Sequence, residues 1–172
     1  MICYRFPDWC KLIIATMLAI FLLLISIIPV YAYKTLDDIE LLARLVWLEA
    51  RGESDKGQQA VVQVVINRLD AGHWGDTLHS VVFAAGQFSR AKSIPKVQPT
   101  DREYRNVQAV LEASEPCLPP WVMYFSSRGK HQWDGYKCYT KIGGHWFGGF
   151  KKDRKAYEKE LATQTAINLQ VK

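Results

Sequence analysis

Apolar side chains recur at helical spacing on both sides of a charged turn, "ESDKGQ", at residues 53–58. "TLDD", from Thr35, has the form of a capping box before the first stretch, and Gly52 lies where that stretch stops. The pattern predicts two helices joined by a short turn, each with one face in the core. The expected core positions are Ile39, Leu42, Leu45 and Val46 in the first helix, and Ala60, Val61, Val64, Val65 and Leu69 in the second.

An acid continues the apolar face of the first helix, because three residues beyond Val46 lies Glu49. A carboxyl group held against apolar walls near the negative end of a helix dipole is disfavoured as an anion, so its pKa should rise. Such an acid can protonate the leaving oxygen of a glycosidic bond. The same pattern also fits a structural glutamate paired with Arg51 or Arg68. The hydrophobic pattern alone leaves both interpretations open.

The rest of the chain predicts a mainly α (α+β) domain over residues 35–165, with four or five helices. Threonine caps mark a short helix at residues 77–84 and a longer one that begins after Thr100. Residues 152–163 form a terminal helix in this prediction. "WVMYFS" at residues 121–126 alternates as a short strand does, so a small β element is expected within residues 121–142.

Residues 12–33 contain no charge and are long enough to cross a membrane as a helix. This length favours an uncleaved signal anchor over residues 1–33, although "VYA" before Tyr33 also resembles a signal-peptidase site, with cleavage near Ala32 and secretion as the alternative. Arg5 and Lys11 precede the span, which keeps the N-terminus in the cytoplasm. The domain is therefore expected at the cytoplasmic membrane, on its periplasmic or extracytoplasmic side.

Cysteine usage and charge agree with an exported domain. Cys117 and Cys138 are the two cysteines after the span, and in an oxidising compartment they are expected to form a disulfide. The net charge of +5 suggests an anionic partner such as cell-wall polymer or membrane surface. Nucleic acid is not an expected partner, because the Lys and Arg residues are scattered along the chain.

Four short motifs resemble the SleB-type cell-wall hydrolases, the spore cortex-lytic enzymes. They are "EARGE" from Glu49, "GQQAVVQVVINR" from Gly57, "GQFS" from Gly86 and "IGGHWF" from Ile142. The resemblance implies an α-rich domain similar to lysozyme-like lytic transglycosylases, with one essential glutamate that acts on peptidoglycan glycan strands. That glutamate corresponds to Glu49.

The last motif departs from the family pattern. Family members often have Asn at the position of Gly144 and Tyr at that of Gly148. Many relatives also carry separate wall-binding repeats, whereas this chain shows none, and its membrane span could position the domain instead.

A second acid decides between mechanisms. Retaining and inverting glycosidases place two carboxyl groups about 5–5.5 Å or about 6.5–9.5 Å apart. Glu53 follows Gly52, which should turn it out of helical register, so a solvated or helix-capping role is expected. Asp76 and Asp101 lie beside the capping threonines Thr77 and Thr100 and are explained by those helix starts. Cleavage of the MurNAc–GlcNAc bond by a lytic transglycosylase, which needs one glutamate, is therefore favoured, with a two-carboxylate hydrolase and a non-catalytic peptidoglycan-binding protein as alternatives.

Polar side chains in loops are the candidates for substrate binding. We expect contacts from Arg51, Gln87, Ser89, Tyr124 and His145. "GQFS" could equally be a simple turn anchored by a buried phenylalanine. Three tryptophans offer flat faces for sugar stacking, although burial in the core explains them as well: Trp121, Trp133 and Trp146.

No metal or other cofactor is expected. His131 and His145, with the two later cysteines, lack the short ligand spacings that zinc sites usually have. A thiol peptidase built on Cys138 and His145 would need a free, activated thiolate, which a disulfide would exclude. His145 is instead expected to lie in a glycine-rich loop and to orient groups at the site.

Overall fold

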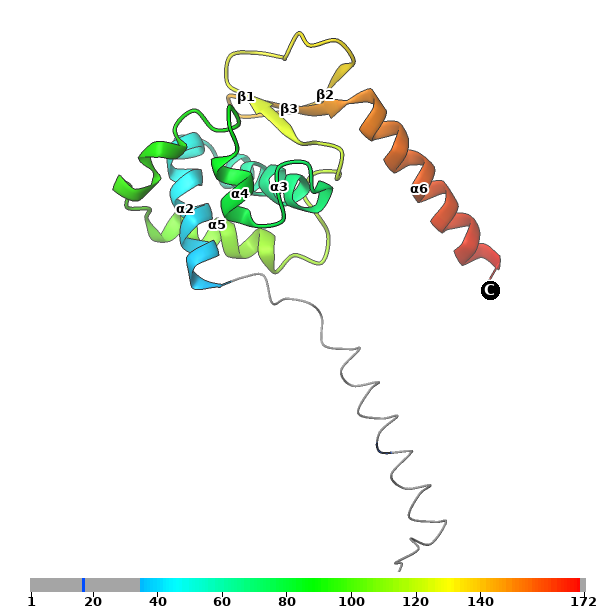
Figure 1. The fold of residues 1–172 in the computed structure, drawn as a ribbon, viewed down its shortest axis with the longest axis horizontal. Helices are drawn as coiled ribbons and strands as arrows, with labels where there is room; N and C mark the ends of the chain where they lie inside the picture. The colour runs from blue at the N-terminus through cyan, green and yellow to red at the C-terminus, as the bar shows by residue number, and fades with distance from the viewer. Residues whose placement is uncertain (1–16, 18–34, 171–172) are drawn as a thin grey trace, which may run out of the picture. The chain divides into compact units, whose positions relative to one another are not determined.

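The structure is a computed structural model that describes Met17 and residues 35–170 (Figure 1). Residues from Leu36 onward form one compact unit. The predicted membrane span at residues 12–33 lies outside the described residues except for Met17. Within the described part of the chain, no helix combines the length and the apolar character that crossing a membrane requires.

Helices make up most of the domain, as the hydrophobic pattern predicts. Both threonine caps are confirmed as capping boxes, at Thr77 and Thr100. The helices are α2 (Leu36–Ala50), α3 (Asp55–Ala71), α4 (Leu78–Phe83), the 3₁₀ helix η1 (Ala91–Lys96), α5 (Asp101–Leu111) and α6 (Lys151–Gln170).

Helix α3 runs through the centre of the domain and packs against α2, α4, α5 and β1 (Tyr124–Ser126) (Figure 1). Its valines Val61, Val62, Val64 and Val65 are fully buried, so the helix is apolar around more of its circumference than a surface helix would be. Ser54 caps it by accepting a hydrogen bond from the Gly57 N–H at 3.3 Å. The core therefore surrounds α3, and α2 ends against it.

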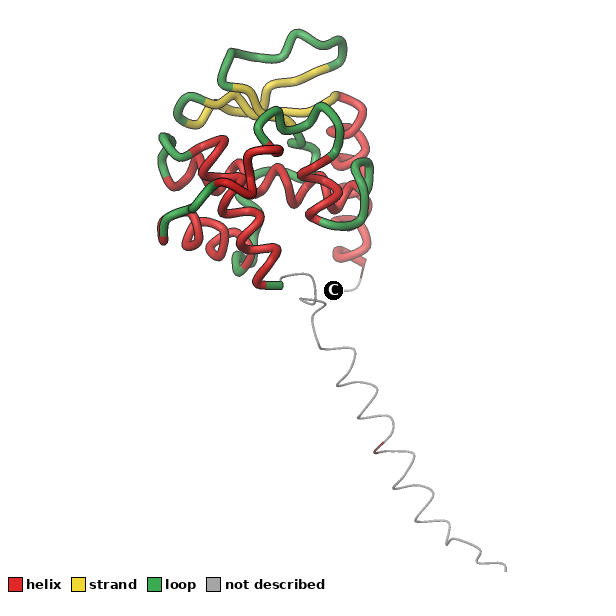
Figure 2. The backbone as a smooth tube through the Cα atoms, turned by 60° about the vertical axis from the view of Figure 1, so that its left-hand side comes forward, coloured by secondary structure: helices red, strands yellow, loops and turns green. Residues whose placement is uncertain are grey.

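A three-stranded antiparallel sheet forms a second layer beside the helices (Figure 2). Its order is β1-β3-β2, with β2 at Tyr136–Ile142 and β3 at His145–Phe150. The prediction of a glycine-rich loop around His145 was therefore wrong, because this segment is the second strand of a hairpin. Buried His145 and Phe147 alternate with the half-buried Trp146, which is the period of a strand.

Glycine in β3 reflects close backbone packing. A Cβ at Gly148 would lie 2.1 Å from the Lys137 carbonyl oxygen, and one at Gly149 would lie 1.9 Å from the Trp121 carbonyl oxygen. Both distances are too short for any side chain. The space beside Gly148 is thus filled by the backbone of the neighbouring strand.

Helix α6 begins at Lys151, directly after β3, and continues to Gln170, beyond the predicted end of the terminal helix at residue 163. Its start is fixed by the Lys151 N–H, which donates to the Gly135 carbonyl at 2.8 Å. This hydrogen bond ties the first residue of α6 to the β1–β2 loop.

The predicted disulfide is wrong, because both Cys117 and Cys138 are free. Cys117 follows α5, and its N–H donates to the Gln63 side chain on α3. Cys138 lies on β2 in a hollow that it shares with Trp121 and Tyr157. Each cysteine therefore belongs to a different layer of the fold.

Candidate active site

Glu49 lies in the last turn of α2 and lines a cavity of about 580 Å³, which we call the Glu49 cavity. Helices form one side of this cavity, and the sheet with the loop after β1 forms the other. The lining residues are Leu48, Glu49, Glu53, Arg68, residues 86–90, residues 125–128 and His145. Most of these side chains are polar or charged, which suits a ligand rich in hydroxyl and amide groups.

The Glu49 carboxyl group is partly buried, and its Oε1 atom has no hydrogen-bond partner among the described residues. Burial raises the pKa of Glu49, and the positive charge of Arg90 offsets part of this rise. Arg90 itself is held by a 2.7 Å hydrogen bond from Nη1 to the Leu48 carbonyl. A raised pKa favours the protonated carboxyl group, which can donate its proton to a ligand.

The structural ion pair that the sequence left open does not form among the described residues. The Arg51 guanidinium lies 4.3 Å from the centroid of the Trp47 ring and does not line the cavity. Arg68 donates from Nε to the Met123 carbonyl at 2.7 Å. Neither arginine lies within 4 Å of the Glu49 carboxylate, so the carboxyl group keeps the raised pKa that burial gives it.

Arg68 is a buried cation in the wall of the cavity, and only 3% of its surface is exposed. Its guanidinium packs against the rings of Trp74, Phe88 and Tyr124 at 4.8–5.4 Å. Burial lowers the pKa of Arg68 to about 10, so the side chain is still charged at neutral pH. The sequence signal for it was a cation four residues after Val64 and three after Val65, on the apolar face of the helix.

Glu53 lies in the same cavity as Glu49, and the predicted solvated or capping role was wrong. Its Oε2 atom accepts a 3.0 Å hydrogen bond from the Gly144 N–H, and its Oε1 atom lies 3.5 Å from His145 Nδ1. A Cβ at Gly143 would lie 1.9 Å from Glu53 Oε2, so the approach requires glycine. Glu53 therefore connects the turn after α2 to the β2–β3 turn.

His145 presents its ring to the cavity from the buried face of β3. Burial lowers the pKa of His145, and the charge of Glu53 raises it by less. The ring is thus mainly neutral at pH 7, where its contact with Glu53 is not an ion pair. A neutral imidazole in this place can donate or accept one hydrogen bond to a ligand.

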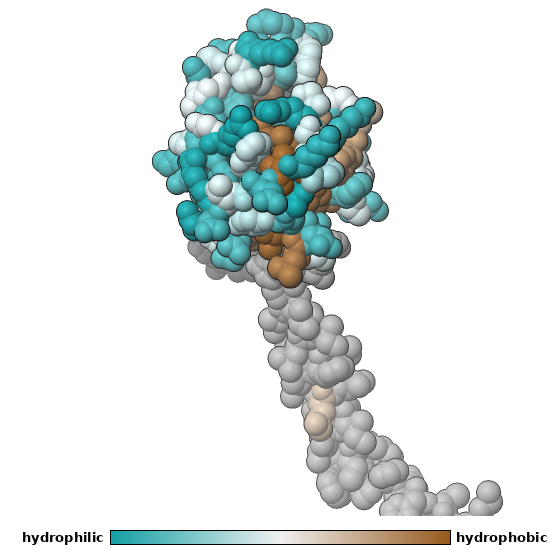
Figure 3. Space-filling view, turned by 90° about the vertical axis from the view of Figure 1, so that its left-hand side faces the viewer, coloured by the Kyte–Doolittle hydropathy of each residue, from teal (hydrophilic) through white to brown (hydrophobic). Residues whose placement is uncertain are grey.

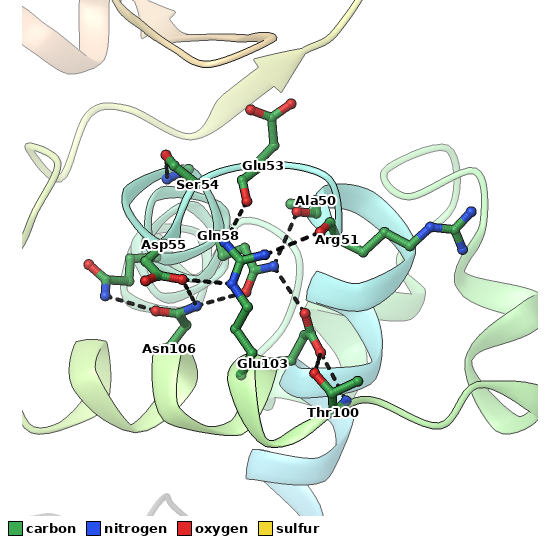
Figure 4. Close-up of polar contacts among 12 residues, drawn as sticks. Ala50, Arg51, Glu53, Ser54, Asp55, Gln58, Thr100, Glu103 and Asn106 are labelled. Atoms are coloured by element: carbon green, nitrogen blue, oxygen red, sulfur yellow. Dashed lines mark hydrogen bonds and ion pairs between the residues drawn. The ribbon is translucent and has the colours of Figure 1, made fainter.

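A polar network behind the turn between α2 and α3 holds the backbone next to Glu49 and Glu53 in place (Figure 4). Gln58 is fully buried, and its Nε2 atom donates to the Ala50 carbonyl at 3.4 Å and to Glu103 Oε1 at 3.0 Å. Asn106 Nδ2 donates to Gln58 Oε1 at 2.8 Å and to Asp55 at 3.0 Å. The end of α2, the start of α3 and helix α5 are thus tied together below the cavity.

Arg102 ties the turn itself to α5. Its Nη2 atom donates to the Glu53 carbonyl at 2.7 Å, and its Nε atom bonds Asp55 at 2.8 Å. Figure 4 shows the Glu53 side chain directed away from this network, towards the strands, and Arg51 directed to another side. Arg102 thus holds the backbone of the turn on the α5 side, and the Glu53 carboxylate accepts its hydrogen bond from the β2–β3 hairpin on the other side.

Replacing Gln58 by Leu is expected to lower the free energy of unfolding by about 1–3 kcal/mol, because Asn106 and Glu103 each lose a buried partner. Urea unfolding followed by circular dichroism measures this loss. Gln108 is exposed on α5, so Gln108→Leu provides a matched control with little expected change. Equal midpoints for the two variants would show that the network does not stabilise the fold.

The structure brings three of the predicted substrate-binding residues into the Glu49 cavity, namely Gln87, Ser89 and His145. Arg51 and Tyr124 are not among its lining residues. Tyr124 lines a separate hollow with Trp74 and residues of α6. The predicted helix-start acids, Asp76 and Asp101, are adjacent to their capping threonines and also lie outside the cavity.

The three tryptophans proposed for sugar stacking differ in their surroundings. Trp121 is buried at 6% exposure. Trp133 is stacked against His131 at 3.9 Å and against Phe150 at 6.1 Å. The half-buried Trp146 carries lysine side chains near its ring. None of the three lines the cavity, so sugar stacking inside it would have to use other groups.

Several lining residues gave no signal in the sequence, namely Arg90, Ser126, Ser127 and Arg128. Isolated polar residues in loops or at the end of a short strand have no periodicity, so only the fold shows that they face the cavity. Among the described residues, no three His, Cys, Asp or Glu side chains are grouped as a metal site would require.

Comparison with known proteins places residues 52–148 in the family described as Cell Wall Hydrolase. The chain is 38% identical over 78 residues to the spore cortex-lytic enzyme of Oceanobacillus iheyensis, covering 45% of this chain and 27% of the relative. It is 28% identical over 113 residues to that of Bacillus subtilis, covering 64% and 37%. The chain thus spans less than two fifths of either relative.

Two solved structures have a similar fold. One is the catalytic domain of the germination-specific lytic transglycosylase SleB from Bacillus anthracis, with a TM-score of 0.58 and 24% identity over 67% of this chain and 96% of that chain. The other is the catalytic domain of the Bacillus cereus SleB protein, with a TM-score of 0.57 and 25% identity over 66% and 91%. The described domain is therefore comparable in extent to these catalytic domains.

Proposed function

The chain belongs to the cell wall hydrolase family, and we propose that it cleaves the glycan backbone of peptidoglycan at the MurNAc–GlcNAc bond. The observation that carries this proposal is Glu49, a partly buried acid in a polar cavity, whose pKa is raised and whose Oε1 atom has no hydrogen-bond partner among the residues that the structure describes. General-acid cleavage of a glycosidic bond needs such a group.

In the proposed mechanism, Glu49 acts first as an acid and then as a base, as in lysozyme-like lytic transglycosylases. It protonates the glycosidic oxygen, which leaves with the GlcNAc residue as the bond to MurNAc C1 breaks. The resulting carboxylate accepts the proton of the muramic acid 6-hydroxyl, whose oxygen bonds C1 and closes a 1,6-anhydro ring. The carboxyl group ends protonated again, and no water is consumed.

One observation favours a second candidate, a two-carboxylate hydrolase. Glu53 lines the same cavity and is only 18% exposed, so a second acid is available to activate water or to bond C1. Its Oε2 atom already accepts the Gly144 N–H, however, so this carboxylate is engaged with the β2–β3 turn. We therefore retain the single-glutamate mechanism as the proposal.

Mass spectrometry of the products tests both the cleavage and its mechanism. Purified full chain incubated with peptidoglycan is expected to release muropeptides with anhydromuramic ends, which are lighter than hydrolysed ends by one water. Hydrolysed ends would instead support the two-carboxylate candidate. Binding to peptidoglycan without release of muropeptides would identify a non-catalytic wall-binding protein and contradict the proposal.

The location is also part of the proposal, because the substrate lies outside the cytoplasmic membrane. Residues 12–33 would anchor the chain there, with secretion after cleavage near Ala32 as the alternative. Fractionation of cells that express the tagged chain would distinguish a membrane-bound protein from a secreted one.

A further inference from the structure

A group of cations borders the Glu49 cavity on its sheet side. Arg128 lines the cavity, next to Ser126, which is paired in the sheet with Trp146. The ammonium groups of Lys130 and Lys141 lie 4.9 and 5.0 Å from the Trp146 ring centroid. We call Arg128, Lys130 and Lys141 the cationic rim. Its three positive charges come from the loop after β1 and from β2, and the two lysines lie beside the same aromatic ring.

The cationic rim has no negative partner in the described chain, since no carboxylate lies within 4 Å of its three charged groups. Arg102 and Arg154, by contrast, form ion pairs with Asp55 and Glu158. All three rim residues are exposed, and hydrophilic side chains cover the end of the domain that carries the sheet (Figure 3). Unpaired like charges held close together repel one another, so an anionic ligand would be bound favourably.

We propose that the cationic rim binds carboxylate groups of the peptide stems of peptidoglycan while the glycan strand occupies the Glu49 cavity. This inference rests on the proposed function. Stems branch from the lactyl group of muramic acid, so their carboxylates lie beside the glycan strand. Arg128 can bind a carboxylate through two parallel hydrogen bonds, and the lysines act as point charges beside it. The preferred substrate is then glycan with acidic stems, rather than neutral glycan.

Trp146 gives the rim a fixed geometry. Each lysine contacts the ring through its ammonium group, which limits the number of rotamers that the long side chain populates. Less conformational entropy is lost when an anion binds to side chains that are already ordered. The ring also fixes the rim relative to the cavity, because the residue before Trp146 is the cavity residue His145.

Binding assays with charge-neutral variants test this inference. The triple variant Arg128→Gln, Lys130→Gln, Lys141→Gln is made in a Glu49→Gln background, so that the substrate is not consumed. Sedimentation with native peptidoglycan is expected to show about tenfold weaker binding, as three exposed charge pairs would predict. Peptidoglycan whose carboxylates were amidated with carbodiimide and ammonia should bind the Glu49→Gln chain more weakly, with little further loss in the triple variant.

A control variant that loses three positive charges elsewhere distinguishes binding by the rim from attraction by the net charge of the chain. Lys56→Gln, Lys155→Gln, Lys159→Gln removes the same charge from exposed positions away from the rim, and it should retain most of the binding. Equal loss of binding to native peptidoglycan in both triple variants would overturn the inference. So would a rim variant that loses as much binding to amidated peptidoglycan as it loses to native peptidoglycan. So would loss of binding to phosphatidylglycerol vesicles without loss of binding to peptidoglycan, because the rim would then be a membrane contact.

A parallel digestion by the otherwise unchanged chain keeps the two proposals distinguishable. Absence of released muropeptides together with rim-dependent binding would contradict the catalytic proposal alone. Release of muropeptides together with rim-independent binding would contradict the rim alone. Thermal unfolding of each variant verifies that the substitutions leave the fold intact.

Discussion

Replacing Glu49 by Gln is expected to lower the rate of peptidoglycan cleavage by at least the ~10²–10⁴-fold that acid–base catalysis contributes. Gln keeps the size of the side chain but carries no proton that can be transferred to the leaving oxygen. The rate is measured as muropeptides released per unit time from purified peptidoglycan. Glu160→Gln, which changes an exposed glutamate on α6, is the matched control and should retain the full rate.

The same variant is expected to be at least as stable as the unchanged chain. The pKa of Glu49 is raised in the folded state, so folding favours the protonated form. The stability that the protonated Glu49 side chain contributes is fully present below its unfolded-state pKa. It is lost as the pH rises through its folded-state pKa. At an alkaline pH, where a larger fraction of the carboxyl group is ionised, its partly buried charge therefore costs more stability, which Gln avoids. A clearly lower unfolding temperature for Glu49→Gln at that pH would show that its inactivity reflects misfolding.

The sequence predicted the helical half of the fold because its signals are local. Helical spacing and capping residues lie within a few positions of one another, as at Thr77 and Thr100, and the fold preserves both. The position of Glu49 followed from the same spacing, since three residues beyond a buried Val46 lies at the inner side of α2. Local patterns thus located the candidate acid before any tertiary contact was known.

Contacts between distant segments were not predictable in this way. Glu53 and Gly144 are 91 positions apart, and their hydrogen bond depends on the β2–β3 hairpin. The glycines of this segment predicted a loop and not a hairpin. The prediction of a disulfide was wrong for a related reason. The expected compartment and the number of cysteines give no information on the distance between Cys117 and Cys138. Arg128 likewise became a site residue only when the loop after β1 was placed beside α2.

Replacing Glu53 is expected to give two different results, depending on the substituent. Gln keeps an oxygen that can accept the Gly144 N–H, so cleavage should fall by less than about tenfold, the loss of one weakened contact. Ala removes the acceptor and leaves the β2–β3 turn unsupported, which would let His145 move within the cavity. Because misplacement by about 1 Å can cost ~10²-fold, Glu53→Ala should be far slower than Glu53→Gln.

The ends of the products show which role Glu53 has. If it positions the hairpin, both variants should still release anhydromuramic ends, only more slowly, because Glu49 performs both proton transfers. If it is a second catalytic carboxylate, Glu53→Gln should be as inactive as Glu49→Gln although folded, and the unchanged chain should release hydrolysed ends. Rate and product mass, measured on the same samples, therefore separate a glutamate that holds the hairpin from one that takes part in the chemistry.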